Sequence, residues 1–128
     1  MGARSRRKGR AWEQEVARRL RDMLPGCEVV RTASLQAHVA AHAPDVTAGN
    51  LLAVECKCGA APNVWAALDQ MRAAEAAAEP DGRFRMVAVH RDSSGGGRPA
   101  KECVVMEWAT FAEIVAALWA ETKPSRAR

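Results

Sequence analysis

Residues 43–57 read Ala-Pro-Asp-Val-Thr-Ala-Gly-Asn-Leu-Leu-Ala-Val-Glu-Cys-Lys, which places two acids and a lysine among apolar residues typical of β-strands. Alternation with a period of two puts Glu55 and Lys57 on one face of a strand and its apolar residues on the other. Charges on a buried strand are costly unless they are paired or used. A tight turn at residues 49–50 lets the chain fold back, so we expect Asp45 to lie beside Glu55.

This patch of two carboxylates and one ammonium group has the composition of a metal site. Carboxylate oxygens are hard ligands, which suit Mg²⁺ or Mn²⁺. A lysine next to such an ion can steady an attacking hydroxide or a phosphate. Asp45, Glu55 and Lys57 are therefore the first candidates for catalytic residues.

The remaining patterns predict an α/β fold with a mixed sheet flanked by helices, in the order α-β-β-β-α-β-β-α. A helix over residues 9–24 ends at Pro25-Gly26, and an Ala-rich helix over residues 62–79 ends at Pro80. Thr110 and Glu113 form a capping box that predicts the start of the last helix. Strands are expected over residues 28–32, 44–48, 51–58, 83–90 and 102–107.

Two helices carry apolar stripes at helical spacing. The first stripe contains Trp12, Val16, Leu20, Met23 and Leu24. Glu13 borders this stripe, which makes it a site candidate once the downstream acids are considered. The last helix has a stripe of Phe111, Ile114, Val115, Leu118 and Trp119.

The length of 128 residues fits one domain, which we place at residues 8–121. A basic arm over residues 1–7 is expected to be flexible without a ligand, and a basic tail covers residues 122–128. Residues 1–21 carry eight Lys or Arg and two acids, whereas residues 22–122 have a net charge of −5. Basic ends around an acidic centre suit a nucleic acid partner, or else a solvated tail that aids solubility.

The sequence contains neither a secretory signal nor an apolar run near ~18 residues, so we expect a cytoplasmic protein without a membrane partner. Its four cysteines are then reduced and act as small buried hydrophobic residues. His38, His42, Cys56 and Cys58 offer a zinc-stabilised module as an alternative, although they lack the common zinc spacing. The Arg- and Ala-rich composition would also suit a phage of a GC-rich host.

The pattern Asp45-x9-Glu55-x-Lys57 resembles the signature of the PD-(D/E)xK nucleases. Residues 8–13, Lys-Gly-Arg-Ala-Trp-Glu, are similar to the Lys-Gly-x-x-x-Glu opening of archaeal-type Holliday junction resolvases, a family also found in phages. Residues 44–50 resemble their central Pro-Asp-Ile-Val-Ala segment. The resemblance covers roughly residues 8 to 118.

The resemblance implies a magnesium-dependent DNA endonuclease, with Mn²⁺ as a substitute ion. Asp45, Glu55 and the backbone carbonyl of Cys56 would bind the metal, and Glu13 would complete the shell directly or through water. Lys57 would orient the nucleophilic water. Gln70 matches a glutamine that assists related sites, although it could equally be a surface residue.

The implied substrate is branched double-stranded DNA, cut by paired nicks in a four-way junction. Two symmetric cuts require two active sites and therefore a homodimer. Arg31 and Ser34 lie where resolvases carry an Arg and a Ser near the scissile phosphate, but this sequence lacks the usual Gly-Ser. Arg31 could instead form a structural salt bridge. The expected phosphate contacts are Arg4, Arg6, Arg7, Lys8, Arg10, Arg31 and Ser34.

Two other functions remain open at this point. A nuclease of the same fold could act on duplex, flap or other branched DNA. A basic nucleic-acid-binding module could instead carry the acids for structural reasons only, although it would not need both acids and the lysine.

Overall fold

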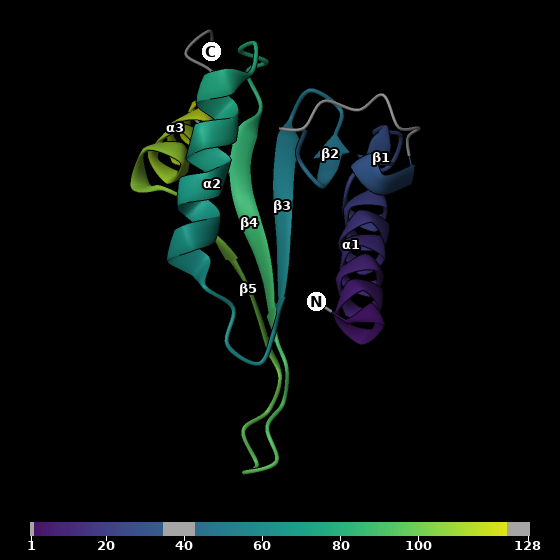
Figure 1. Cartoon of the computed structure of the whole chain (residues 1–128). Coiled ribbons are helices and arrows are strands. Elements are labelled where there is room, and N and C mark those ends of the chain that lie inside the picture. Colours follow the sequence, from purple (N-terminus) through teal and green to yellow (C-terminus); the bar gives the residue numbers. More distant parts are fainter. Residues whose placement is uncertain (1, 35–42, 123–128) are drawn as a thin grey trace, which may run out of the picture.

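The computed structural model describes residues 2–34 and 43–122, which form a mixed sheet flanked by helices (Figure 1). The order α-β-β-β-α-β-β-α confirms the predicted fold class. Among the described residues, no helix is long and apolar enough to cross a membrane. The elements are α1 (Ala3–Met23), β1 (Val29–Arg31), the 3-10 helix η1 (Thr32–Ser34), β2 (Val46–Ala48), β3 (Leu52–Gly59), α2 (Val64–Ala77), β4 (Phe84–Arg91), β5 (Lys101–Val105) and α3 (Trp108–Thr122).

The five strands lie in the order β1-β2-β3-β4-β5. Only β3 and β4 pair in parallel, because α2 carries the chain across between them. The predicted turn joins β2 to β3: Gly49 has a positive φ of 50°, and Leu51 N–H donates to Ala48 O at 3.0 Å. Val46 pairs with Val54, so the antiparallel register brings the preceding Asp45 level with Glu55.

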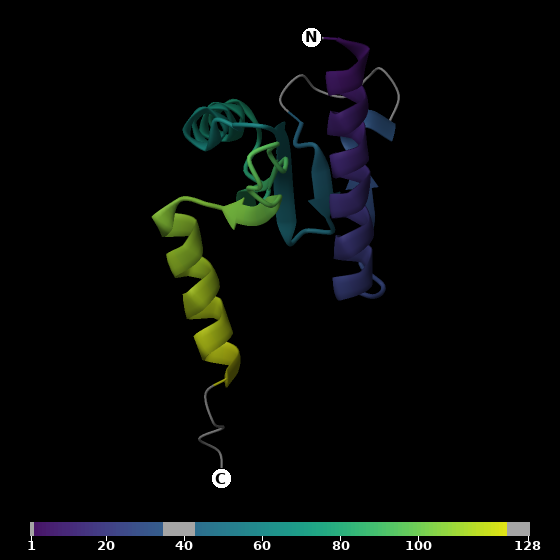
Figure 2. The same cartoon turned by 90° about the horizontal axis from the view of Figure 1, so that it is seen from below.

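Helices α1 and α2 cover opposite faces of the sheet (Figure 2). The face under α1 contains Val46, Val54 and Met86, which pack with the α1 stripe. The face under α2 contains Val87 and Val89, which pack against Ala67, Leu68 and Met71. Both faces of β3 are thus covered, which explains why its sequence is apolar apart from the two charged residues.

Helix α1 begins at Ala3, six residues before the predicted start, so the described residues of the expected flexible arm are helical. Ala, Arg and Lys are strong helix formers, and the single glycine at position 9 costs only about 1 kcal/mol. Met23, assigned to the buried stripe of this helix, is 65% exposed. The predicted tail over residues 122–128 lies outside the described residues except for Thr122.

The start of α3 also differs from the prediction. The helix begins at Trp108, and Phe111 N–H donates to Glu107 O at 3.1 Å, so Thr110 lies inside the first turn and is not a cap. No residue of α3 is buried. Figure 2 shows α3 running away from the sheet. Only Ile114 of the predicted stripe packs against the core, while its other members are exposed.

The cysteines differ in burial. Cys27, Cys56 and Cys58 are partly buried and pack against the core beneath α1, in agreement with the prediction. Cys103 is exposed on β5, contrary to the prediction, because β5 is an edge strand that is solvated over most of its length.

A buried leucine and an exposed leucine allow a direct test of this core. Leu20 is 6% exposed and Leu51 is 44% exposed. We expect Leu20→Ala to lower the free energy of unfolding by about 2–5 kcal/mol, because it leaves a cavity under α1. Leu51→Ala should change it by less than about 1 kcal/mol. Urea denaturation followed by circular dichroism would measure both, and equal losses would contradict the placement of α1.

Candidate active site

Asp45 lies directly before the first residue of β2, next to a part of β3 that has no strand paired with it on the β2 side. Its carboxylate Oδ2 accepts a hydrogen bond from Cys56 N–H at 2.8 Å, in place of the missing strand partner. Its carbonyl accepts from Thr32 N–H at 2.9 Å, and the Thr32 hydroxyl donates to Pro44 O. These bonds hold the Asp45 carboxylate at the edge of β3.

Glu55 lies beside Asp45, as the sequence predicted, and their carboxyl groups are within hydrogen-bonding reach. Burial raises the pKa of Glu55 to about 7, and the negative charge of Asp45 adds to the increase. Lys57 and Arg85 oppose it, but with smaller effects. Two carboxylates that repel each other in a partly buried position are a site prepared for a cation.

Lys57 follows on the same face of β3 and is the ammonium group of the predicted patch. Its Nζ donates to Gln70 Oε1 of α2 at 3.3 Å. Gln70 therefore contacts a candidate catalytic residue, although its side chain lies on an exposed part of α2. The helix that covers this face of the sheet thus also positions the lysine.

Glu13 reaches the site from α1, on the other side of the β3 edge. Its side chain is 19% exposed, and burial and then Asp45 raise its pKa. Arg31 of β1 opposes this increase and lies 3.5 Å from the Glu13 carboxylate. The guanidinium group of Arg31 is only 14% exposed, so the structure places it against Glu13 and largely away from solvent.

The donor set fits a divalent ion bound by a few protein ligands. Asp45 and Glu55 supply two adjacent carboxylates, and Glu13 lies close enough to feel the Asp45 charge. Within the described segments, no three His, Cys, Asp or Glu side chains are grouped closely enough to form a complete metal cage. Magnesium commonly binds through one or two carboxylates and keeps several waters, so it does not need such a cage.

The thiols are poor alternatives as metal ligands. Burial raises the pKa of Cys56, and the surrounding carboxylates raise it further, which keeps the thiol protonated. Burial also raises the pKa of Cys58. The two histidines of the zinc alternative, His38 and His42, lie outside the described residues.

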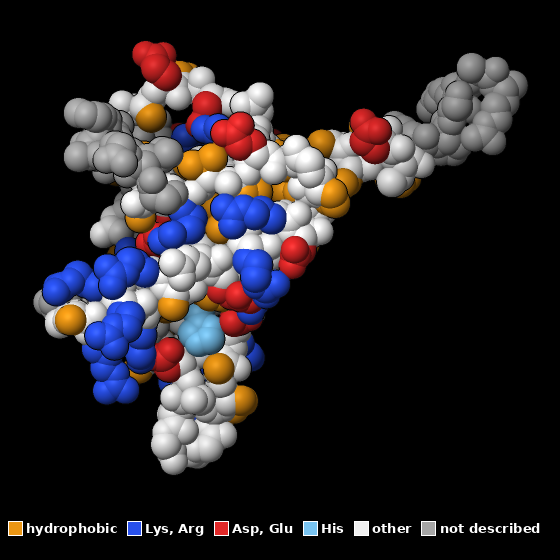
Figure 3. Space-filling view, turned by 90° about the vertical axis from the view of Figure 1, so that its right-hand side faces the viewer, with side chains coloured by type: hydrophobic (Ala, Val, Ile, Leu, Met, Phe, Trp, Pro, Cys, Tyr) orange, Lys and Arg blue, Asp and Glu red, His pale blue; other side chains and the backbone are white. Residues whose placement is uncertain are grey.

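The basic residues of α1 occupy the surface at the end where this helix begins. Figure 3 shows Lys and Arg side chains gathered there, on the face that α1 presents. Arg31 is absent from this exposed group because it lies against Glu13. For Ser34 the structure describes only the backbone, at the end of η1. The exposed candidates are Arg4, Arg6, Arg7, Lys8 and Arg10.

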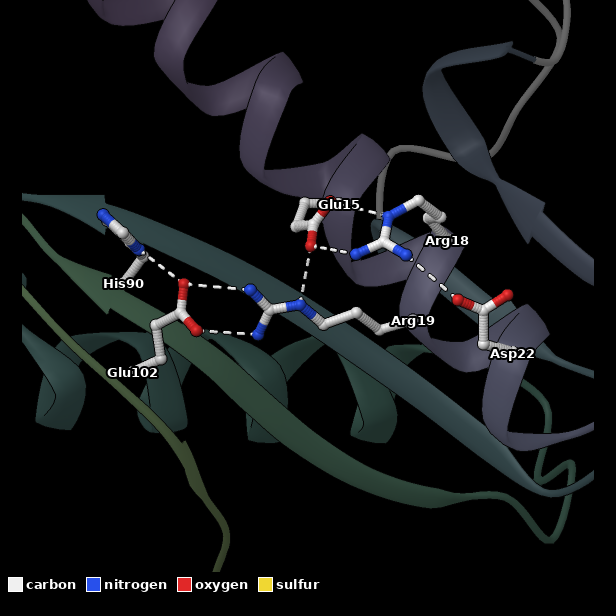
Figure 4. A network of polar contacts seen from close by, with 6 residues as sticks. All are labelled: Glu15, Arg18, Arg19, Asp22, His90 and Glu102. Carbon is white, nitrogen blue, oxygen red and sulfur yellow. Dashed lines mark hydrogen bonds and ion pairs between the residues drawn. The ribbon is translucent and has the colours of Figure 1, made fainter.

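Arg18 and Arg19, which lie farther along α1, belong to an ion-pair network between α1 and β5 (Figure 4). Arg18 binds Glu15 and Asp22, whereas Arg19 binds Glu15 and Glu102 at 2.7 Å. Their charges are therefore compensated within the protein.

His90 joins this network through Glu102 at 2.9 Å, and its ring lies 5.3 Å from that of Trp12. This arrangement supports a structural role for His90.

Arg85 was not identified from the sequence. It is 7% exposed on β4 and forms ion pairs with Glu75 at 3.2 Å and Asp81 at 3.0 Å. Its positive charge also lowers the pKa of Glu55. The sequence feature that could have identified Arg85 is the presence of a cation inside the apolar run of residues 84–89, on the same face as Val87.

A mixed sheet with an acid before its second strand, Glu-x-Lys on its third and a glutamate from the first helix defines a nuclease of the PD-(D/E)xK superfamily. The family model described as archaeal Holliday junction resolvase (hjc) matches residues 4–78, more than half of the chain, and the chain belongs to this family. Its members are metal-dependent DNA endonucleases that resolve Holliday junctions. No curated protein and no solved structure matches the chain significantly.

The raised pKa of Glu55 makes the stability of the metal-free protein depend on pH. Because the pKa is about 7 in the folded state and near its usual value of 4.5 in the unfolded state, the folded protein binds the proton more tightly. Stability should therefore fall as pH rises from about 4.5 to about 7. We expect the free energy of unfolding of Glu55→Gln to fall by about 1–2 kcal/mol less than that of the wild type over this pH interval, after allowance for solvent screening.

The measurement is urea denaturation at several pH values in EDTA, compared between wild type and Glu55→Gln. Taking the difference between the two proteins removes the contributions of other titrating groups. Parallel pH curves would contradict the assigned environment of Glu55.

Proposed function

We propose that this chain cuts Holliday junctions at a site in which Asp45 and Glu55 hold Mg²⁺, with Mn²⁺ as a working substitute. The adjacency of these two carboxylates carries the proposal, because a cation would relieve the repulsion between them, which adds to the effect of burial in raising the pKa of Glu55. The backbone carbonyl of Cys56 is the third proposed ligand. Glu13 completes the site directly or through a bound water.

Each remaining residue has a role that follows from its position. When bound, the metal polarises the phosphate and lowers the pKa of a bound water. Lys57 lies on the same face of β3 as Glu55 and orients the attacking water or the phosphate. Gln70 restricts the Lys57 side chain through their hydrogen bond. Arg31 holds Glu13 in place and, with it, keeps the charge of the site balanced.

DNA is held first by its phosphates at the basic beginning of α1. Arg4, Arg7 and Arg10 are exposed and charged there, so they can exchange counterions for phosphates. Lys8 already pairs with Asp92 at 2.8 Å and contributes less net charge. Sequence-specific reading is not part of this proposal, and the protein recognises the shape of the junction.

Loss of either metal-binding carboxylate should separate binding from cutting. We expect Asp45→Asn and Glu55→Ala to reduce cleavage of a labelled immobile four-way junction by at least about 100-fold in Mg²⁺. Binding of the junction should be kept or become tighter, because a negative charge near the phosphates is removed. Gel-shift and cleavage assays on the same junction would measure both quantities.

Asp69→Asn is the matched control, because Asp69 is an exposed carboxylate of α2 next to Gln70. It should cut at the wild-type rate. Linear duplexes made from the junction arms complete the experiment. Unchanged cleavage by the two site variants would refute the site, whereas equal cutting of the linear duplexes would refute selectivity for the junction.

The paired cuts of resolution require two active sites, and we propose that two copies associate through β5 and α3. Most of β5 is solvated, and α3 has no buried residue. Leu118 and Trp119 are each 61% exposed and Val115 is 45% exposed, and together they form a large exposed apolar surface. Within the stripe only Ile114 packs against the core, and a helix of 15 residues with so little packing is marginally stable in water, so α3 needs a further partner.

A groove on the same chain supports this choice of surface. It has a volume of about 380 Å³ and lies between α1 and β5, where residues of β3 and β4 line its base. Met23, Met86 and Val104 are among its mostly apolar lining residues. The connection from β5 to α3 spans only residues 106–107, and Arg72 of α2 holds Glu107 at 3.0 Å. These constraints favour the helix of a second copy as the occupant. Helix α2 is a weaker candidate for the dimer surface, because Trp65 is its one exposed large hydrophobic residue among the described residues.

A charged residue in the α3 stripe should break the dimer. We expect Leu118→Lys to weaken self-association at least about tenfold, because it places an ammonium group in the buried interface. The variant should then nick junctions without paired cuts. Ala120→Lys adds the same charge on the exposed side of α3 opposite the stripe and should stay dimeric. Sedimentation velocity would compare them, and a dimeric Leu118→Lys would refute this interface.

A further inference from the structure

The connection between β4 and β5 is a hairpin that projects beyond the sheet. Figure 1 shows the loop extending past the body of the molecule, at the end where α1 begins. The loop covers residues 92–100 and contains three consecutive glycines, Gly95 to Gly97. The core does not require such an extension, because the buried part of β4 ends at Val89.

The base of this hairpin is braced on both sides. Lys8 of α1 binds Asp92 at 2.8 Å, and Asp92 N–H donates to Gly59 O at 2.8 Å. On the other strand of the hairpin, an Arg98 guanidinium N–H donates to Ala60 O at 3.1 Å. The hairpin is therefore held against both α1 and the connection that follows β3.

The tip is a hydrogen-bonded turn. Ser94 N–H donates to Arg98 O at 2.9 Å, and Gly97 N–H donates to Ser94 O at 3.1 Å. The Ser94 hydroxyl accepts from Arg98 N–H at 3.3 Å. Gly97 has a φ of 88°, a conformation that favours glycine. The shape of the tip thus explains one of the three glycines.

The fold does not explain the other two glycines. Neither Gly95 nor Gly96 has a positive φ. A Cβ atom added at Gly95 would meet no atom within 4 Å, and one at Gly96 would meet only Ser94 Oγ at 3.9 Å. A side chain would therefore fit at both positions in the isolated protein. Glycine at such positions suits the close approach of a ligand to the backbone.

The charges around the hairpin are suited to a polyanion. Arg98 lies at the tip, and the base carries Lys101. The Asp92 carboxylate is compensated, because its hydrogen bond to Lys8 lowers its pKa and Arg4 lowers it further. The hairpin therefore continues the basic surface at the beginning of α1 instead of opposing it.

We infer that the tip of the β4–β5 hairpin, residues 94–98, is a second DNA-contacting element, which touches the sugar–phosphate backbone of the DNA bound by α1. This inference rests on the proposed DNA-binding function. The glycines allow the phosphates to approach the backbone N–H groups of the tip, and the braced base holds the tip at a fixed position relative to α1. Backbone N–H groups are common phosphate ligands in protein–DNA complexes.

The double variant Gly95→Ala/Gly96→Ala tests this inference directly. The added methyl groups meet no close contact within the chain, so the melting temperature should stay the same or rise slightly. We expect the affinity for a four-way junction to fall about three- to tenfold, and the slope of log affinity against log salt to become shallower by about 0.9 for each lost phosphate contact.

A charged pair of variants gives an independent control. Gly96→Glu places a carboxylate at the tip, and Ala76→Glu places the same charge on the exposed side of α2. We expect Gly96→Glu to weaken junction binding at least tenfold more than Ala76→Glu. Affinities within twofold of wild type for all the tip variants would overturn the inference and leave the proposed function intact. A wild-type protein that does not bind junctions would refute both.

Discussion

The site depends on one hydrogen bond, from Cys56 N–H to the Asp45 carboxylate at 2.8 Å. β3 extends past the start of β2, so its backbone would leave a polar group without a partner at this edge. Asp45 satisfies that group with its side chain while its own carbonyl continues the pairing with η1 at Thr32. The same contact places one carboxylate at the distance from Glu55 at which the two repel. The same hydrogen bond therefore completes the sheet edge and positions Asp45 in the proposed metal site.

The chain balances this concentration of negative charge with cations that are themselves restrained. Arg31 lies against Glu13, and Lys57 is bound to Gln70. Arg85 is buried on β4, on the same face of the sheet as Glu55, and forms ion pairs with Glu75 and Asp81. Each cation lowers the cost of a carboxylate without closing the edge of β3 from which the metal and the DNA would enter. Lys57 and Arg85 oppose the effects of burial and of the Asp45 charge on the pKa of Glu55, but they do not cancel them.

The N-terminal and C-terminal parts of the sheet differ in how they are stabilised. Trp12, with its indole N–H bound to Ala88 O at 3.0 Å, and the rest of the α1 stripe cover β2 and β3. The family match, over residues 4–78, includes this part and all the proposed catalytic residues. Beyond it, β5 and α3 leave most of their large apolar residues in solvent, with Val105 and Ile114 as the exceptions. The part that carries the chemistry is thus closed within one chain, whereas the last strand and helix are suited to contacts between chains.

The order of elements, the turn at Gly49 and the pairing of Asp45 with Glu55 could all be predicted from the sequence. Each of these follows from local periodicity, turn chemistry or antiparallel register, which act over a few residues. Other features depend on partners that are distant in the sequence, and these are visible only in the folded chain. The burial of Arg85, the placement of Arg31 against Glu13 and the exposure of the α3 stripe are set by elements that lie tens of residues away. An apolar stripe has the same sequence pattern whether its partner is the chain's own sheet or another molecule, because periodicity specifies a face but not what covers it.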